Sequence, residues 1–175
     1  MTKQLNHVEF KGRQIRFSPN IVLVLENLEH EENIGSAFRL ADAFGIRKIL
    51  IVTNKEFEVK KVEKTARNCT KNVPFEIVST INEAFAKIKE LKCLPVSVEI
   101  CDNSVPLRDC DFSQYKGVAL IVGNEREGVS QYALDNSAFS VHIDMYGVNS
   151  SINVSTALAI ALYKCSEDYL LKKRY

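Results

Sequence analysis

The sequence has no tryptophan, only two methionines and no apolar run long enough to cross a bilayer. Its first residues lack the apolar core of a signal peptide. Positive and negative charges almost cancel, with 23 lysines and arginines against 22 aspartates and glutamates. The overall charge therefore does not by itself indicate a nucleic-acid partner. We expect a cytoplasmic protein that has no membrane partner.

Cysteine pairs are also missing, although the chain contains five cysteines. Their number is odd and no two of them have C-x-x-C spacing, which argues against a disulfide framework and against a zinc site. We expect buried thiols in a reducing compartment, and no metal. The five are Cys69, Cys93, Cys101, Cys110 and Cys165.

The apolar pattern predicts a single domain over residues 1–175, with residues 1–20 as an N-terminal extension. Strands are expected at 21–25, 48–52, 75–78, 94–100, 118–122 and 139–143. Helices are expected at 34–44, 81–91, 130–136 and from 153 onward, with a partly helical, exposed stretch at 56–72 and a loop at 102–116. This alternation indicates an α/β fold in which helices flank a mainly parallel sheet. Ligands bind such sheets at the carboxyl ends of the strands.

Basic residues cluster locally. The segment 60–71 carries five basic residues against one acidic residue, and further groups are Lys11, Arg13 and Arg16 and the tail 172–174. A run of charge is usually a solvated face, but an RNA-binding surface would need such clusters.

Three polar segments interrupt the apolar pattern. The first is Asn33-Ile-Gly-Ser-Ala-Phe-Arg39, the second is the Gly-Asn-Glu-Arg-Glu-Gly turn after the 118–122 strand, and the third spans Gly147 to Asn153. Each has an ordinary explanation as a helix cap or a turn. The second is neither a G-x-G-x-x-G turn nor a Walker A loop, so a pyrophosphate cofactor is not supported. S-adenosylmethionine, read by backbone groups near a glycine, fits this description, although spacing alone does not select it.

In this order and spacing, the three segments and their flanks resemble the motifs of the SpoU (TrmH-like) 2'-O-ribose RNA methyltransferases of the SPOUT superfamily. The first motif matches Asn33 to Arg39, the second Ile121 to Val129 and the third Ile143 to Ser155. The resemblance runs from about Ile21 to the final helix. It implies transfer of a methyl group from S-adenosylmethionine to a ribose 2'-hydroxyl of tRNA or rRNA. It also implies a C-terminal trefoil knot, and a homodimer whose active site takes residues from both subunits.

The resemblance also assigns roles to residues. The implied cofactor-binding residues are Val98, Ile121, Gly123, Asn124, Ile143, Met145, Ser151 and Ile152, and the implied catalytic residues are Arg39, Asn33, Glu125, Ser151 and Asn153. Arg39 carries the central role. Because arginine stays protonated in proteins, we favour a clamp on phosphate that stabilises the developing alkoxide, and the family-level alternative of a general base stays open.

Two positions depart from the family pattern. Asp144 stands where the third motif usually has proline, and Ile152 stands where it usually has leucine. The aspartate puts a carboxylate near the expected cofactor pocket. The three histidines, His7, His30 and His142, lie outside the motifs and are expected to be incidental.

Other functions remain to be separated from this one. One is an RNA-binding protein with this fold and no catalysis, against which the presence of both Arg39 and Glu125 argues. Another is methylation of a base nitrogen, although the first motif favours ribose. The third is an α/β enzyme for a different nucleotide, which the missing phosphate loop disfavours.

Overall fold

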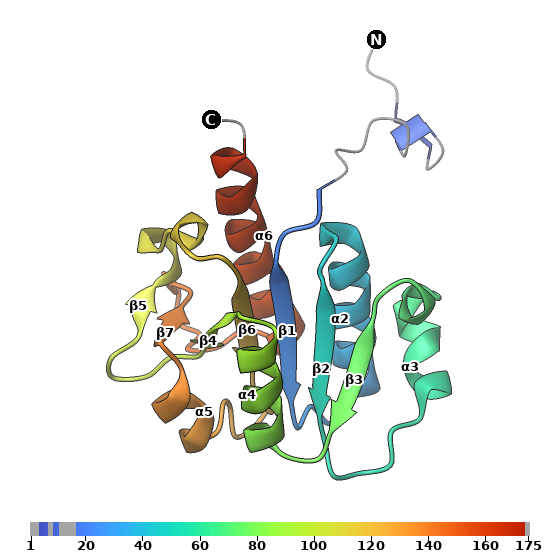
Figure 1. Cartoon of the computed structure of the whole chain (residues 1–175), viewed down its shortest axis with the longest axis horizontal. Coiled ribbons are helices and arrows are strands. Elements are labelled where there is room, and N and C mark those ends of the chain that lie inside the picture. Colours follow the sequence, from blue (N-terminus) through green and yellow to red (C-terminus); the bar gives the residue numbers. More distant parts are fainter. Residues whose placement is uncertain (1–3, 7–8, 11–16, 174–175) are drawn as a thin grey trace.

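A computed structural model describes residues 4–6, 9–10 and 17–173, and these are organised around one sheet (Figure 1). Seven strands follow the order β3-β2-β1-β6-β4-β7-β5, and every neighbouring pair is parallel. The strands are β1 (Ile21–Glu26), β2 (Lys48–Val52), β3 (Phe75–Val78), β4 (Leu94–Val98), β5 (Val105–Pro106), β6 (Val118–Val122) and β7 (Phe139–His142). The predicted α/β fold is confirmed. His7, Lys11, Arg13, Arg16 and Arg174 lie outside the described residues.

Helices cover both faces of the sheet. Helices α2 (Glu31–Phe44), α3 (Val59–Ala66) and α6 (Val154–Lys172) pack on one face, and α4 (Ile81–Glu90) and α5 (Gln131–Asn136) pack on the other. The central strand β1 shows why its sequence is continuously apolar. Ile21, Leu23 and Leu25 point into the first core and Val22 and Val24 into the second, so no side chain of this run reaches water.

Two helix boundaries coincide with residues that favour them. Gly45 ends α2 in the left-handed conformation, with φ of 63°. At the start of α4, the Thr80 hydroxyl accepts a hydrogen bond from the Glu83 amide at 3.2 Å, and the Glu83 carboxylate accepts one from the Ser79 amide at 2.9 Å. The Thr80–Glu83 capping box is therefore formed, with Ser79 as the donor on the return side.

The structure differs from the sequence prediction in the 94–116 region. Strand β4 ends at Val98, two residues early, and the predicted 102–116 loop contains β5 and the short 3-10 helices η2 (Leu107–Asp109) and η3 (Phe112–Gln114). A strand of two residues has no periodicity to detect, and Pro106 argues against a strand except at a sheet edge, which is where β5 lies. The ambiguous 56–72 stretch forms α3 and the 3-10 helix η1 (Cys69–Lys71).

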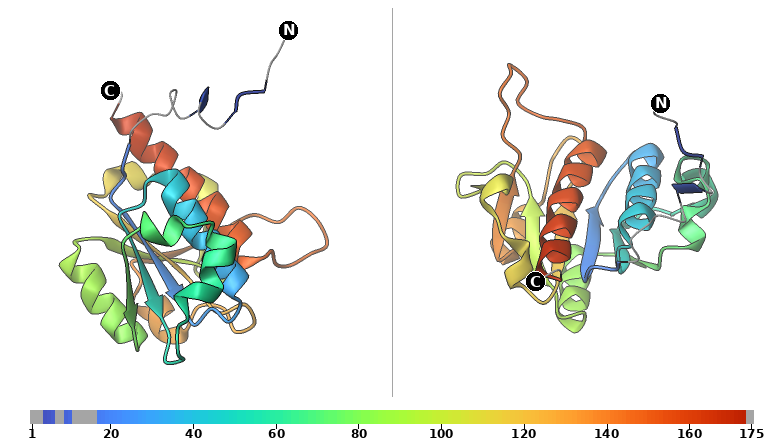
Figure 2. Two further views of the ribbon diagram at one scale, coloured as in Figure 1. Left: turned by 90° about the vertical axis from the view of Figure 1, so that its right-hand side faces the viewer. Right: turned by 90° about the horizontal axis from the view of Figure 1, so that it is seen from above.

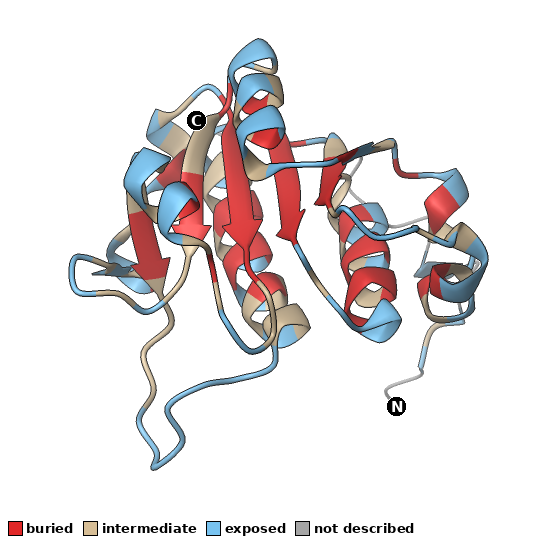
Figure 3. Ribbon diagram, turned by 90° about the horizontal axis from the view of Figure 1, so that it is seen from below, coloured by how far each residue is buried: buried red, intermediate tan, exposed pale blue. Residues whose placement is uncertain are grey.

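The segment 143–153 joins β7 to α6 and projects from the body of the molecule (Figure 2). Most of it is exposed, in contrast to the buried strands (Figure 3). At its tip, the side chains of Tyr146 and Val148 are 89% and 104% exposed. This loop, which we call the pocket loop, rises beside the carboxyl ends of β4, β6 and β7.

Candidate functional site

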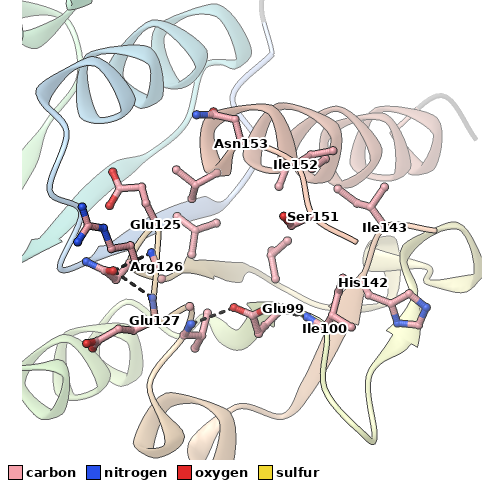
Figure 4. A pocket seen from close by; sticks show the side chains of 18 of the residues that line it. Glu99, Ile100, Glu125, Arg126, Glu127, His142, Ile143, Ser151, Ile152 and Asn153 are labelled. Atoms are coloured by element: carbon pink, nitrogen blue, oxygen red, sulfur yellow. Dashed lines mark hydrogen bonds between the residues drawn. The ribbon is translucent and has the colours of Figure 1, made fainter. Parts of the chain in front are cut away.

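A pocket of about 800 Å³ lies at the carboxyl ends of β4, β6 and β7 (Figure 4). The pocket loop and the turn after β6 form opposite walls, and the start of α2 closes one end. Its apolar lining comes mainly from strand ends and the pocket loop, and its polar lining from the turn. The lining residues include Val98, Glu99, Ile100, Val122, Gly123, Asn124, Glu125, Ile143, Met145, Ser151, Ile152 and Asn153.

The turn after β6 is held by its own backbone. Asn124 and Gly128 exchange two backbone hydrogen bonds of 3.0 and 2.9 Å, and the Asn124 carboxamide oxygen accepts from the amides of Arg126 and Glu127. A Cβ on Gly123 would lie 2.1 Å from the Gly128 carbonyl carbon, so only glycine fits there. Gly128 adopts a φ of +72°. The glycines at both ends of this turn are therefore structural requirements.

Three side chains from the three polar segments form one hydrogen-bonded chain, which we call the relay. The Glu125 carboxylate accepts from the Asn33 carboxamide at 2.8 Å, and the Asn33 carboxamide oxygen accepts from Asn153 at 3.1 Å. The Asn153 oxygen in turn caps α6 by accepting from the amides of Ser155 and Thr156. The three segments therefore meet at one place.

Glu125 also caps α2, whose N-cap residue supplies no side-chain cap. Its carboxylate accepts from the backbone amides of Glu29 and His30 at 2.9 and 3.1 Å. Partial burial raises the pKa of Glu125, but the hydrogen bonds from Glu29, Asn33 and His30 outweigh it and hold the pKa below its ordinary value. Glu125 is therefore held as a carboxylate at the junction of the turn and α2.

The predicted cofactor-binding residues lie mostly in the pocket. Seven of them line it, namely Val98, Gly123, Asn124, Ile143, Met145, Ser151 and Ile152. The side chain of Ile121 does not, because it is fully buried in the core beneath α4 and α5. Side chains alternate along β6, and Val122 is the residue of that strand which reaches the pocket.

Arg39 lies outside the pocket of its own chain. It is exposed on α2, six residues beyond Asn33, which places it about 9 Å further along the helix axis. Among the described residues it forms no hydrogen bond or ion pair, and its charge is felt by the nearby Cys69 thiol. The other four predicted catalytic residues, Asn33, Glu125, Ser151 and Asn153, line the pocket.

The unusual Asp144 is neutralised by a partner. Its carboxylate forms an ion pair with Arg108 of η2 and does not line the pocket. The pKa of Asp144 is lowered mainly by its hydrogen bond to Arg108. This ion pair joins the base of the pocket loop to the segment after β5.

Some pocket residues belong to none of the three motifs. Glu99 follows β4 directly, and its two carboxylate oxygens accept from the amides of Val129 and Ile100 at 2.9 Å each. In the sequence, the one sign that Glu99 could belong to a site is its position as a carboxylate at the end of a strand. His30 and His142, which the sequence placed outside the motifs, also line the pocket, and a hydrogen bond of 3.0 Å joins His142 Nδ1 to the Ser104 hydroxyl.

The five cysteines are all free thiols. Cys93 and Cys165 are buried as expected, whereas Cys69, Cys101 and Cys110 are half-buried. Burial raises the pKa of Cys165 well above its ordinary value. Within the described ranges, no three histidine, cysteine, aspartate or glutamate side chains gather as a metal site would require, and no helix is long and apolar enough to span a membrane.

Comparison with known proteins places this geometry in a family context. Residues 20–163 match the model of the SpoU rRNA Methylase family. The chain is 28% identical to the tRNA (guanosine(18)-2'-O)-methyltransferase of Thermus thermophilus, covering 89% of this chain and 78% of that protein. It is 26% identical to the Escherichia coli protein of the same name, covering 85% of this chain and 64% of that one.

A solved structure has the same fold. The A. aeolicus TrmH/SpoU tRNA modifying enzyme superimposes with a TM-score of 0.80 at 26% identity, covering 89% of this chain and 78% of that chain. The chain spans less than two thirds of the length of several curated relatives, including the Escherichia coli protein.

Proposed function

The chain belongs to the SpoU rRNA methylase family, and we propose that it is an RNA methyltransferase that transfers a methyl group from S-adenosylmethionine to a ribose 2'-hydroxyl of tRNA or rRNA. The observation that carries this proposal is the relay. Glu125, Asn33 and Asn153 come from three separate segments and bond to one another beside one pocket. A ribose-methylating enzyme needs a site of this kind, where donor and acceptor are held in line.

The pocket fits S-adenosylmethionine. Its volume of about 800 Å³ falls in the range for small-molecule sites, and it combines apolar walls with a few fixed polar groups. Val98, Ile143, Met145 and Ile152 supply apolar surface for an adenine ring, and the backbone of the Gly123 turn supplies donors and acceptors. When bound, S-adenosylmethionine supplies a methyl group on a good leaving group. Alignment and activation of the hydroxyl are left to the chain.

We propose that Arg39 works in the pocket of a second subunit in a homodimer. Arg39 does not line its own pocket and has no ionic partner among the described residues. Helix α6 supports an interface because it is apolar on two sides. Leu158 and Leu162 are buried in the core, while Ile160, Tyr163 and Leu171 are exposed on the outer side. Such a stripe is typical of a surface covered in an assembly.

In this arrangement the partner's Arg39 binds the phosphate beside the target ribose. A guanidinium pairs with phosphate through two hydrogen bonds and stabilises negative charge that develops on the hydroxyl oxygen. The proton leaves to the phosphate or to water, because an arginine is a poor base. The relay holds the start of α2 against the turn and thereby fixes the helix that carries Arg39.

Two further features complete the proposal. The C-terminal segment is threaded through a loop of the chain as a trefoil knot. A crystal structure whose chain trace is topologically unknotted would exclude this. The protein works in the cytoplasm, consistent with its five free thiols.

The proposal is tested by supplying the purified protein with labelled S-adenosylmethionine and RNA from a strain that lacks it. We expect label in RNA, recovered after nuclease digestion as a 2'-O-methylnucleoside. A base-methylated nucleoside would move the reaction to a base nitrogen. RNA binding without any label would leave an RNA-binding protein.

The Arg39→Ala variant gives the sharpest result in this assay. We expect it to fold, to dimerise and to bind S-adenosylhomocysteine like the wild type, while methyl transfer falls by about 100-fold or more. Arg47→Ala is the matched control, because Arg47 lies beyond the C-terminal end of α2, away from the pocket, and bonds to Asn20 and the Leu91 carbonyl. Transfer that survives in Arg39→Ala would remove Arg39 from the mechanism.

A further inference from the structure

Glu99 is a carboxylate in the pocket to which neither the sequence motifs nor the proposed mechanism gives a role. It follows the last residue of β4 and lies across the pocket from Ile152 and Asn153 (Figure 4). The side chain is half-buried. A carboxylate in this position lost part of its hydration when the chain folded, so its hydrogen bonds matter to what the pocket accepts.

Both oxygens of Glu99 are oriented by the backbone. One accepts from the Val129 amide and the other from the Ile100 amide, each at 2.9 Å. The first oxygen also lies where a Cβ of Gly128 would be, at 2.5 Å, so the turn leaves room for it. Each oxygen keeps capacity for a second donor, because a carboxylate accepts about four hydrogen bonds. Glu99 is therefore a fixed pair of acceptors with unused capacity.

The three asparagines and the relay carboxylate that line this pocket are already engaged. Asn33 and Asn153 are used at both ends of their carboxamides by the relay, and Asn124 is used at both ends within the turn and by the Asn27 carbonyl. Glu125 accepts from three donors at the start of α2. Among the carboxylates that line the described pocket, Glu99 is the one whose two oxygens are both held in place and both incompletely used.

The geometry points to Glu99 as the residue that binds the two ribose hydroxyls of the adenosine part of the methyl donor. This inference rests on the proposed function. A vicinal diol presents two neighbouring O–H donors, and a carboxylate presents two neighbouring acceptors, so one side chain satisfies both. The carboxylate of the methionine part would be repelled by Glu99. The apolar side chains of Val98 and Ile100, on either side of Glu99, suit the adenine ring instead.

Glu99 would also link cofactor binding to the turn. The same carboxylate that meets the diol holds the Val129 amide, directly after Gly128. A ligand hydrogen bond to a charged acceptor that is already oriented costs little reorganisation. Glu99 therefore acts in donor specificity and positioning, because it contacts the cofactor away from the reacting atoms.

The test uses S-adenosylhomocysteine and its 2'-deoxy and 3'-deoxy analogues, with binding measured by calorimetry. We expect the wild type to bind each deoxy analogue about 10-fold or more weakly than the parent, because a hydrogen bond to a charged group is lost. Glu99→Gln should bind the parent about 10-fold more weakly and lose less than about 3-fold further on removal of either hydroxyl. Because each protein serves as its own reference, a change in folded fraction does not mimic this pattern.

Asp102→Asn is the matched control, since Asp102 is an exposed acid three residues away that does not line the pocket. This variant should lose as much affinity for each deoxy analogue as the wild type does. If removal of a hydroxyl weakened binding equally in the wild type and in Glu99→Gln, the role of Glu99 would be overturned, while the proposed function would stand. If the wild type bound no S-adenosylhomocysteine, both would fall.

Discussion

The two walls of the pocket are built differently. The turn from Gly123 to Val129 is tied by paired backbone hydrogen bonds, by Asn124 and by the carboxylates of Glu99 and Glu125. The pocket loop is mostly exposed, and its base is tied to the neighbouring segment by the Asp144–Arg108 ion pair. One wall is therefore preorganised before any ligand arrives, while the other is held by few contacts.

The largest difference is expected when a methyl group is added to one wall and then to the other. Gly123→Ala places a Cβ 2.1 Å from backbone atoms of Gly128, which cannot move without breaking the turn. We expect a loss of about 3 kcal/mol in the free energy of unfolding, measured by urea denaturation. Gly147→Ala in the pocket loop meets nothing within 4 Å and should change stability by less than about 0.5 kcal/mol. Similar losses in both variants would abolish the distinction between the walls.

Glu125→Gln removes a charge from the rigid wall. At pH 7 the substitution should lower the free energy of unfolding by about 1–2 kcal/mol, because several donors lose a charged acceptor. The pKa of Glu125 is lowered in the folded protein, so its stabilisation is fully present above the ordinary value of 4.5 and is lost as pH falls through the lowered value.

The measurement is urea denaturation of both proteins from pH 7 down to about pH 3.5. The wild type and Glu125→Gln should converge below about pH 4.5. Glu127→Gln is the control in the same turn, because the exposed Glu127 carboxylate accepts no hydrogen bond from the described residues. If the difference in free energy of unfolding between the wild type and Glu125→Gln stayed constant down to about pH 3.5, this account of the Glu125 pKa would be refuted.

The smallest effect is expected at the base of the pocket loop. Arg108→Gln removes the exposed partner of the half-buried Asp144, and the attraction within this pair is screened by salt. We expect S-adenosylhomocysteine to bind about two- to five-fold more weakly at low salt, and the difference from wild type to vanish near 1 M salt. The double variant Asp144→Arg with Arg108→Asp should recover wild-type affinity. No recovery would show that the pair is not what holds the loop base.

The fold was largely predictable because its strands are apolar on both faces. The runs 21–25, 48–52 and 118–122 are all buried in a parallel sheet, and such runs are hard to mistake when helices with one apolar side separate them. Strand β5 was not predictable. Its two residues, Val105 and Pro106, owe their pairing to β7 and not to any local preference.

The candidate site was predictable where several residues form a motif. Asn33, Glu125 and Asn153 were assigned together through the resemblance, and they bond together in the structure. Ile121 and Glu99 show the limit. Which residue of β6 faces the pocket depends on strand register, and a lone glutamate at the end of β4 has no pattern around it. The site roles themselves remain predictions for the experiments above.

The relay has a consequence for how the chain matures. Its three members are separated by 92 and 120 residues, so the junction cannot close until nearly the whole polypeptide is available. Contacts so distant along the chain form slowly, because a long segment must be ordered before they are gained. While the residues beyond 150 are still inside the ribosome, Glu125 can already bond Asn33, but Asn153 is missing and the relay is incomplete. The pocket should therefore become able to bind its ligand only late in folding, in one step, when α6 docks.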